Sequence, residues 1–198
     1  MSIYDDYNKP KIDLNNEIEF PITDQLSSLI DFDDNVIYIT DVIEEPMLAH
    51  FIIKTRALIK KNNPATINVI INSAGGSVSE AWGIVDFMES SNVKFNTICR
   101  GAAWSAAAII LLGGTNRRFA SKRSSIMLHQ PMSSMDEFTK FSDLANLSLY
   151  ATQQLDMLYD FISSRSNKDK NWWANTLRQD FWISAPEAQQ LNIIDAII

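Results

Sequence analysis

The chain has 198 residues, 46% hydrophobic and 21% charged, which is enough for one domain with a substantial core and short for two. Its 24 acidic residues outnumber its 17 basic residues, and the net charge of -7 has the wrong sign for holding phosphate backbones, so nucleic acid is excluded as an expected partner. The longest apolar run, "AAAIILLGG" at 106–114, is too short to cross a bilayer, so no membrane partner is expected.

The amino end lacks the basic start and apolar core of a secretory signal. The single cysteine, Cys99, lies in the apolar run "FNTIC", where a buried thiol is the ordinary expectation and an intramolecular disulfide is impossible. We therefore expect a cytoplasmic protein in a reducing compartment.

Residues 1–34 are polar, acidic and weakly periodic, which predicts an N-terminal arm that is mobile or ordered by a partner. Residues 35–198 have the pattern of a single domain in which short apolar runs alternate with runs of helical spacing. The expected elements are a strand at 35–40, a helix at 46–61, a strand at 65–72, a helix at 78–90, a strand at 93–100 with a turn at Gly101, and a helix at 104–112. This alternation indicates an α/β fold with a mostly parallel sheet covered by helices.

A single helical pattern then runs from Asp136 to about Ser164, with apolar residues at spacings of three and four. Such a helix would be about 40 Å long, more than a domain of this size needs to cover its own sheet, so we expect part of it to contact another subunit. The alternative is a helix that is broken near its middle and packs wholly within its own domain. Near the end, Ser184 and Glu187 have the spacing of a capping box, and the chain closes on an apolar strand, "NIIDAII".

The candidate nucleophile is Ser105, a lone hydroxyl in "GAAWSAAAII" at the start of a helix expected to be buried. A serine attacks carbonyls only when a base takes its proton and N–H groups stabilise the resulting oxyanion. His129 is a candidate base because it follows the apolar strand "SSIML" and projects into a loop, whereas His50 lies in a helical run that favours a structural role. Taken alone, Ser105 could equally be a helix N-cap and His129 a structural histidine.

The glycine pair Gly75-Gly76 follows the strand "INVIIN" and comes just before a helix. Its amides are free of side-chain bulk and lie near the unpaired amides of the first helical turn, so they could hold an oxyanion. The alternative interpretation of this pair is a tight turn without chemistry.

Four sequence segments, occurring in this order, favour the catalytic interpretation over the structural one: "INSAGGSV", "GAAWSAA", "IMLHQP" and "DFWISAPEA". With them, residues from about 35 to 198 resemble ClpP, the proteolytic subunit family of the Clp serine proteases. The resemblance implies that Ser105 is the nucleophile, His129 the base and Asp180 the carboxylate that orients the imidazole. It also implies that the N–H groups of Gly76 and Ala106 hold the oxyanion.

The resemblance implies a crotonase-like α/β fold with repeated β-β-α units and a long protruding handle helix. It further implies a serine endopeptidase that hydrolyses unfolded polypeptides to short peptides through an acyl-enzyme, inside a chamber of two stacked heptameric rings. A AAA+ Clp-type unfoldase would be the partner and would be the only user of ATP. No metal or organic cofactor is implied.

The chain departs from the family's pattern at several positions. Trp104 stands where the family usually has alanine, Ala74 where it has proline, and Gln179 where it commonly has arginine. Asn68 and Ile70 replace aromatic residues that help to form the docking sites for the unfoldase.

Three alternatives remain beside the endopeptidase. The first is a structural subunit of a mixed oligomeric ring, with a weak or inactive site of its own, because the large side chain of Trp104 lies beside the serine. The glycine loop would also suit a crotonase-type acyl-CoA enzyme, although the ordered Ser, His and Asp segments speak against it. A processing protease that serves one particular target would share the same chemistry.

Overall fold

The computed structural model describes residues 29–131 and 141–198, within which eight strands form one mixed sheet. The main path of the sheet has the order β1-β2-β3-β4-β5-β8, and β6 and β7 are added beside β4. The strands are β1 (Ile30–Asp31), β2 (Val36–Ile39), β3 (Thr66–Ser73), β4 (Lys94–Trp104), β5 (Arg118–Ala120), β6 (Ser125–Leu128), β7 (Phe181–Ser184) and β8 (Ala196–Ile197). Within the described residues, β1 is antiparallel to β2 and β7 is antiparallel to β6, and all other pairs of strands are parallel. The prediction of a mostly parallel sheet is therefore confirmed.

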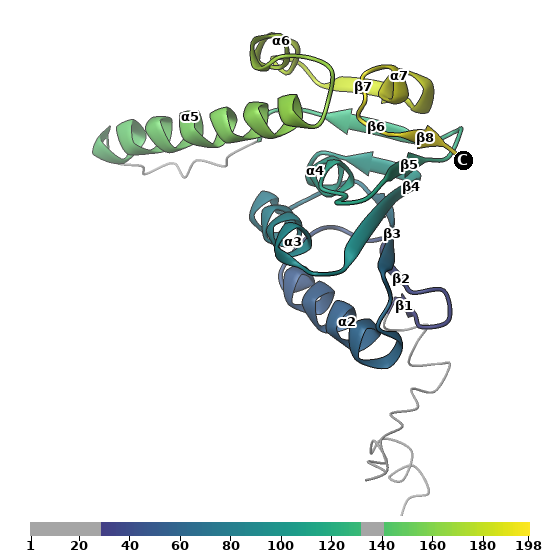
Figure 1. The fold of residues 1–198 in the computed structure, drawn as a ribbon. Helices are drawn as coiled ribbons and strands as arrows, with labels where there is room; N and C mark the ends of the chain where they lie inside the picture. The colour runs from purple at the N-terminus through teal and green to yellow at the C-terminus, as the bar shows by residue number, and fades with distance from the viewer. Residues whose placement is uncertain (1–28, 132–140) are drawn as a thin grey trace, which may run out of the picture.

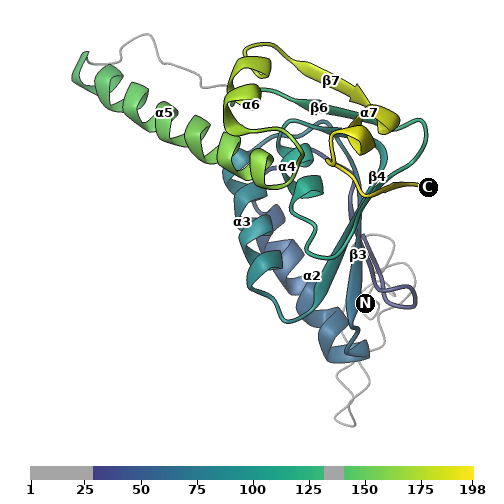
Figure 2. The same ribbon diagram turned by 45° about the horizontal axis from the view of Figure 1, so that its top comes forward.

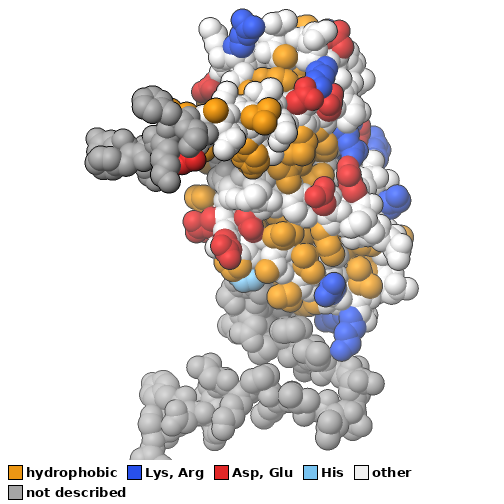
Figure 3. Space-filling view, turned by 90° about the vertical axis from the view of Figure 1, so that its left-hand side faces the viewer, with side chains coloured by type: hydrophobic (Ala, Val, Ile, Leu, Met, Phe, Trp, Pro, Cys, Tyr) orange, Lys and Arg blue, Asp and Glu red, His pale blue; other side chains and the backbone are white. Residues whose placement is uncertain are grey.

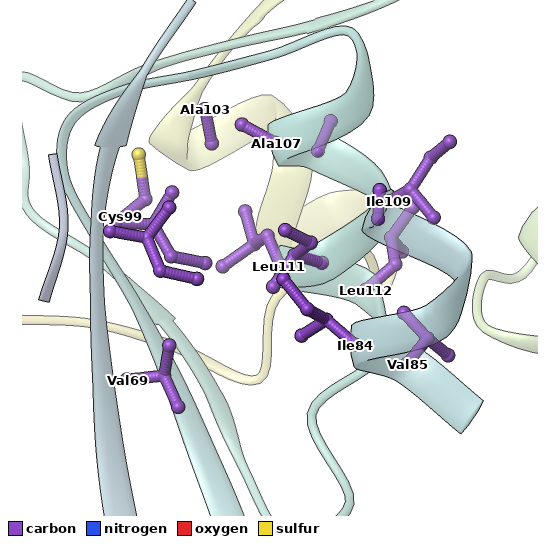
Figure 4. Packing of buried hydrophobic residues seen from close by; sticks show 14 of the residues in the cluster. Val69, Ile84, Val85, Cys99, Ala103, Ala107, Ile109, Leu111 and Leu112 are labelled. Atoms are coloured by element: carbon purple, nitrogen blue, oxygen red, sulfur yellow. The ribbon is translucent and has the colours of Figure 1, made fainter. Parts of the chain in front are cut away.

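Three helices, α2 (Met47–Asn62), α3 (Val78–Ser90) and α4 (Ala106–Leu112), lie on one side of the central strands (Figure 1). The core fills the space between these helices and the sheet, and Figure 4 shows side chains of β3, β4, α3 and α4 packed there. All seven residues of α4 are buried, which explains why its sequence is apolar on every side. Cys99 of β4 belongs to this core as a free, fully buried thiol, as the sequence led us to expect. Its burial raises the pKa of the thiol.

The prediction of a turn at Gly101 is wrong, because β4 continues through this glycine to Trp104. Gly101 has a φ of 122°, and a Cβ there would lie 2.4 Å from Oδ1 of Asn72, so only glycine fits without strain. The sheet divides at this point. Upstream, Thr97 to Cys99 pair with β5, and downstream, Ala102 to Trp104 pair with β6.

The long helix α5 (Phe141–Ser164) has 24 residues, about 36 Å of continuous helix, and its N-terminal part projects away from the domain (Figures 1 and 2). The alternative of a break near the middle is therefore wrong. Residues 136–140 of the predicted range lie outside the described residues. Leu149 and Tyr150 on the projecting part are 62% and 61% exposed, so this part leaves apolar side chains uncovered.

Two short helices complete the C-terminal part, α6 (Lys170–Thr176) and α7 (Ala185–Gln190). The sequence did not indicate α6, although the Asp169 side chain caps its first turn by accepting from the N–H of Trp172. The predicted cap of α7 is present. The Glu187 carboxylate accepts from both the N–H and the hydroxyl of Ser184, at 2.8 and 2.7 Å, and these hydrogen bonds hold the pKa of Glu187 below its usual value.

The folded domain begins earlier than residue 35. Residues 1–28 of the expected arm lie outside the described residues, but Ile30 belongs to β1 and Phe32 is 3% exposed, so the end of that range is part of the sheet and core. Among the described residues, none of the helices combines the length and hydrophobicity needed to cross a bilayer.

Candidate active site

Ser105 lies at the junction between β4 and α4. Its φ of 54° is unusual for a residue with a side chain, and its N–H is held at 2.8 Å by the carbonyl of Met127 on β6. Its carbonyl accepts from the first turn of α4, so the residue occupies the N-cap position, but its hydroxyl makes no capping hydrogen bond. The hydroxyl turns instead to His129, with Oγ 2.6 Å from Nε2. The strained backbone therefore presents the hydroxyl to the imidazole, which favours a chemical role over a capping role.

The pairing of β6 and β7 brings His129 and Asp180 together. The two strands are antiparallel, with Leu128 opposite Phe181, so the next pair beyond this register is His129 and Asp180. Nδ1 of His129 lies 3.9 Å from Oδ1 of Asp180, which is longer than a hydrogen bond but close enough for the carboxylate to attract a positive charge on the imidazole when one forms. The imidazole is 13% exposed and the carboxylate 60%, so water reaches the carboxylate far more easily than the base.

The glycine loop lies directly against the serine. A Cβ on Gly75 would be 2.5 Å from the carbonyl oxygen of Trp104, 2.8 Å from Cβ of Ser105 and 3.0 Å from the N atom of Ala106. A side chain at this position would collide with backbone, and the φ of 96° is itself strained for any other residue. The glycine therefore permits a backbone approach that no other residue allows.

The loop is held on its outer side by two backbone hydrogen bonds with Ile43, which accepts from Ser77 and donates to Gly75. Inside the loop, Ser73 Oγ accepts from the N–H of Gly75 at 3.1 Å and donates to the carbonyl of Asp41 at 2.6 Å. Ser73 is 4% exposed, and its role in shaping this loop was not predicted from the sequence. A serine directly before a glycine loop is the signal that could have pointed to it.

The N–H groups of Gly76 and Ala106 are the oxyanion donors predicted from the sequence. No hydrogen bond from the N–H of Gly76 or of Ala106 is found among the residues that the structure describes. Ala106 begins α4, so its N–H lies at the positive end of that helix and next to the serine hydroxyl. Neither of these N–H groups is therefore committed to another partner within the described part of the chain, and their role as oxyanion donors stays a prediction.

Trp104 does not separate the serine from the histidine. Its Nε1 donates to Oγ of Ser125 at 3.2 Å, and its ring packs edge-on against Trp182 with centroids 5.0 Å apart. The large side chain is therefore directed across β6 toward β7, and the contact between Ser105 and His129 forms beside it.

The second histidine plays no part in this cluster. His50 lies on the exposed side of α2, where it lines a cavity of about 260 Å³ together with Lys54, whose pKa is lowered by burial. None of the three residues of the serine cluster lines that cavity. No group of three or more metal-ligating side chains is found among the described residues.

Known proteins resemble this chain over most of its length. Residues 21–198 match the profile of the family described as Clp protease. The chain belongs to the Clp protease family. Its α/β architecture with a long projecting helix is the ClpP-type fold that the motifs implied.

Three relatives are named as subunits of an ATP-dependent Clp protease. The chain is 37% identical over 133 residues to an ATP-dependent Clp protease proteolytic subunit of Porphyromonas gingivalis, a match that covers 67% of this chain and 59% of that relative. It is 31% identical to the proteolytic subunit 1 of Shouchella clausii, over 83% of this chain and 85% of the relative. A subunit from Cyanophora paradoxa is 29% identical over 97% of this chain and 92% of its own length. The family is thus one of proteases, which supports a peptidase.

Proposed function

We propose that the chain is a serine endopeptidase that hydrolyses unfolded polypeptides to short peptides through a triad of Ser105, His129 and Asp180. The observation that carries the proposal is the 2.6 Å contact between Ser105 Oγ and His129 Nε2, at a serine whose backbone is held at a positive φ. A hydroxyl held against an imidazole, with unpaired amides beside it, has the parts that acyl transfer needs.

In the first half of the reaction, Ser105 Oγ attacks the carbonyl carbon of the scissile peptide while its proton passes to Nε2 of His129. The carbonyl oxygen becomes negative and is held by the N–H groups of Gly76 and Ala106. When the C–N bond breaks, the proton on Nε2 goes to the leaving nitrogen, which departs as an amine. The acyl group stays on Ser105 as an ester.

In the second half, water replaces the amine. His129 takes a proton from water as its oxygen attacks the ester, and the same proton returns to Ser105 Oγ when the ester bond breaks. Asp180 keeps the imidazole oriented and stabilises its positive charge in both halves. The separation of 3.9 Å is loose, as triad contacts can be before substrate is bound.

We further propose that the chain works in an assembly of two stacked heptameric rings, fed with unfolded substrates by a AAA+ Clp-type unfoldase. Exposed apolar side chains support an assembly. Hydrophobic groups gather in several patches on the face toward which α5 projects (Figure 3), and Ile53 on α2 is 64% exposed. The reaction written above uses no metal or organic cofactor, and ATP would be used by the partner alone. The chain would act in the cytoplasm.

The docking surface for the unfoldase is expected to differ from the family's. Asn68, at a position where the family has an aromatic residue, accepts at 2.9 Å from the amide of Asn96, which in turn accepts at 2.8 Å from the amide of Asn116. A ladder of amides thus replaces aromatic surface, which favours a partner that recognises polar groups.

The test is active-site labelling of the full-length protein. A fluorophosphonate should modify Ser105, as identified by mass spectrometry, and the protein should hydrolyse a fluorogenic peptide without ATP. Ser105→Ala should lose both properties while keeping the particle mass. Peptide hydrolysis that persists in this variant would refute the assignment.

The second candidate is a catalytically weak or inactive ring subunit, and the exposed, distant carboxylate of Asp180 is the observation that favours it. Activity measurements on the purified chain alone separate the two. An inactive subunit would assemble to the ring mass and yet show neither labelling nor peptide hydrolysis.

A further inference from the structure

Two aromatic side chains that the reaction does not use lie beside the catalytic residues. Trp104 of β4 and Trp182 of β7 both stand in register with Met127 of β6, which lies between them. Their rings meet edge to face across this strand, with centroids 5.0 Å apart and an interplanar angle of 75°. These three residues form a row across the sheet, which we call the aromatic row.

The aromatic row and the catalytic pair share one face of the sheet. His129 follows Met127 by two residues, and Asp180 precedes Trp182 by two, and side chains two apart along a strand point to the same side. Leu128, between Met127 and His129, faces the other way and is 2% exposed in the core. At about 3.3 Å per residue, the aromatic row lies about 7 Å from the catalytic pair along the strands.

The order of the strands decides which part of a substrate passes over the row. The glycine loop follows β3 and lies against Ser105 on that side of β4, whereas His129 follows β6 on the opposite side. The carbonyl oxygen of the scissile bond points toward the oxyanion donors, so the leaving nitrogen must lie toward His129. The polypeptide that follows the scissile bond therefore continues over β6 and β7.

The row is built to receive a side chain. Trp104 is anchored by its hydrogen bond to Ser125 Oγ, so its ring is held in place before anything binds. Trp182 has no such anchor in the described residues and leaves 51% of its surface exposed, although aromatic rings of this size are usually better covered. An exposed ring packed against a fixed one presents apolar surface at low entropic cost.

We propose that Trp104 and Trp182 bind an aromatic or large apolar side chain of the substrate polypeptide, within the first two residues after the scissile bond. This inference rests on the proposed function and adds to it a preference on the leaving-group side. An extended peptide advances about 3.3 Å per residue, so a distance of about 7 Å from the imidazole corresponds to these two positions.

The experiment compares internally quenched peptides that differ only at the two residues after the scissile bond, with the cleaved bond identified by mass spectrometry. The full-length protein should hydrolyse peptides with phenylalanine or leucine there about five- to tenfold faster, in kcat/KM, than peptides with serine or aspartate. Trp182→Ala should reduce this preference to about twofold or less, and Trp182→Phe should preserve most of it. Ile59→Ala, at an exposed apolar position near the end of α2 that has no part in the site, is the matched control and should change nothing.

Fluorophosphonate labelling separates this inference from the proposed function, because the probe has no polypeptide on its leaving side. Trp182→Ala should be labelled at the wild-type rate. A variant that is labelled normally and keeps the full preference overturns the inference, as does a variant that loses labelling and peptide hydrolysis equally. A changed particle mass in Trp182→Ala would show that the tryptophan side chain contacts a second copy of the chain, which would also overturn the inference. A wild-type protein that cannot be labelled overturns the proposed function itself.

Discussion

Replacing Gly75 by alanine should abolish peptide hydrolysis. The new Cβ would lie 2.5 Å from the carbonyl oxygen of Trp104 and 2.8 Å from Cβ of Ser105, and neither atom belongs to a flexible side-chain end. The positive φ costs about 1–3 kcal/mol for a residue with a side chain, and the overlap costs about 1–3 kcal/mol more. The loop would relieve this cost of about 2–6 kcal/mol by moving away from the serine, which would carry the N–H of Gly76 away from the oxyanion.

The expected loss in kcat is at least about a hundredfold, the usual effect of removing one oxyanion donor. Gly83→Ala is the matched control, because Gly83 lies within α3 and its new Cβ would meet only the flexible end of Leu48. The assay is hydrolysis of a fluorogenic peptide by both variants, with thermal unfolding of each. If Gly75→Ala keeps wild-type kcat in a folded particle, the close approach of the glycine loop is irrelevant to the chemistry.

Three further predictions concern single side chains. The pKa of Glu187 is lowered in the folded chain. The ionised carboxylate therefore stabilises the fold above its unfolded pKa of about 4.3, and this contribution is lost as the pH falls through the folded value. The difference in melting temperature between wild type and Glu187→Gln should accordingly shrink on acidification below about pH 4. Tyr159 of α5 accepts a hydrogen bond at 2.9 Å from the side-chain amide of Gln130, the residue after His129. Tyr159→Phe removes this hydroxyl and should lower kcat severalfold while leaving KM unchanged. An unchanged kcat would show that α5 does not position the segment that carries His129. Asp180→Asn should lower kcat about 5- to 30-fold, because a largely exposed carboxylate about 4 Å from the imidazolium stabilises the transition state by about 1–2 kcal/mol. A loss of several thousandfold would indicate a much tighter contact between Asp180 and His129 in the working particle.

Hydrophobic periodicity was sufficient to predict the central helices and the longer strands. The predicted range 78–90 coincides with α3, and the predicted range 65–72 differs from β3 by one residue at each end. These elements bury one continuous apolar side, and local spacing alone reveals that burial. The short strands β1, β5 and β7 were missed, because each has four residues or fewer, too short for a periodic pattern. The strands β5 and β7 also depend on pairing with strands far along the chain.

The residues of the candidate site could be named from motifs, but the geometry that joins them could not. Ser105 and His129 are 24 positions apart, and no local pattern reports that Oγ and Nε2 are in hydrogen-bonding contact. The orientation of Trp104 was equally hidden, because it depends on the hydroxyl of Ser125 and the ring of Trp182 on two other strands. Trp104 stands where the family usually has alanine and looked able to block the site, but its side chain lies beside the contact between Ser105 and His129.

Gly101, which was predicted to form a turn, instead lets β4 continue from one partner strand to another. Gly101 lies where β4 leaves β5 and joins β6, and the Asn72 side chain holds the next residue by accepting from the N–H of Ala102 at 3.0 Å. If β4 had ended there, β6 would lose its pairing with β4 and keep only β7, and the carbonyl of Met127 could not hold Ser105. The meeting of hydroxyl and imidazole therefore depends on a backbone conformation four residues upstream of the serine. A side chain at Gly101 would disturb the site without touching any of the three residues that form it.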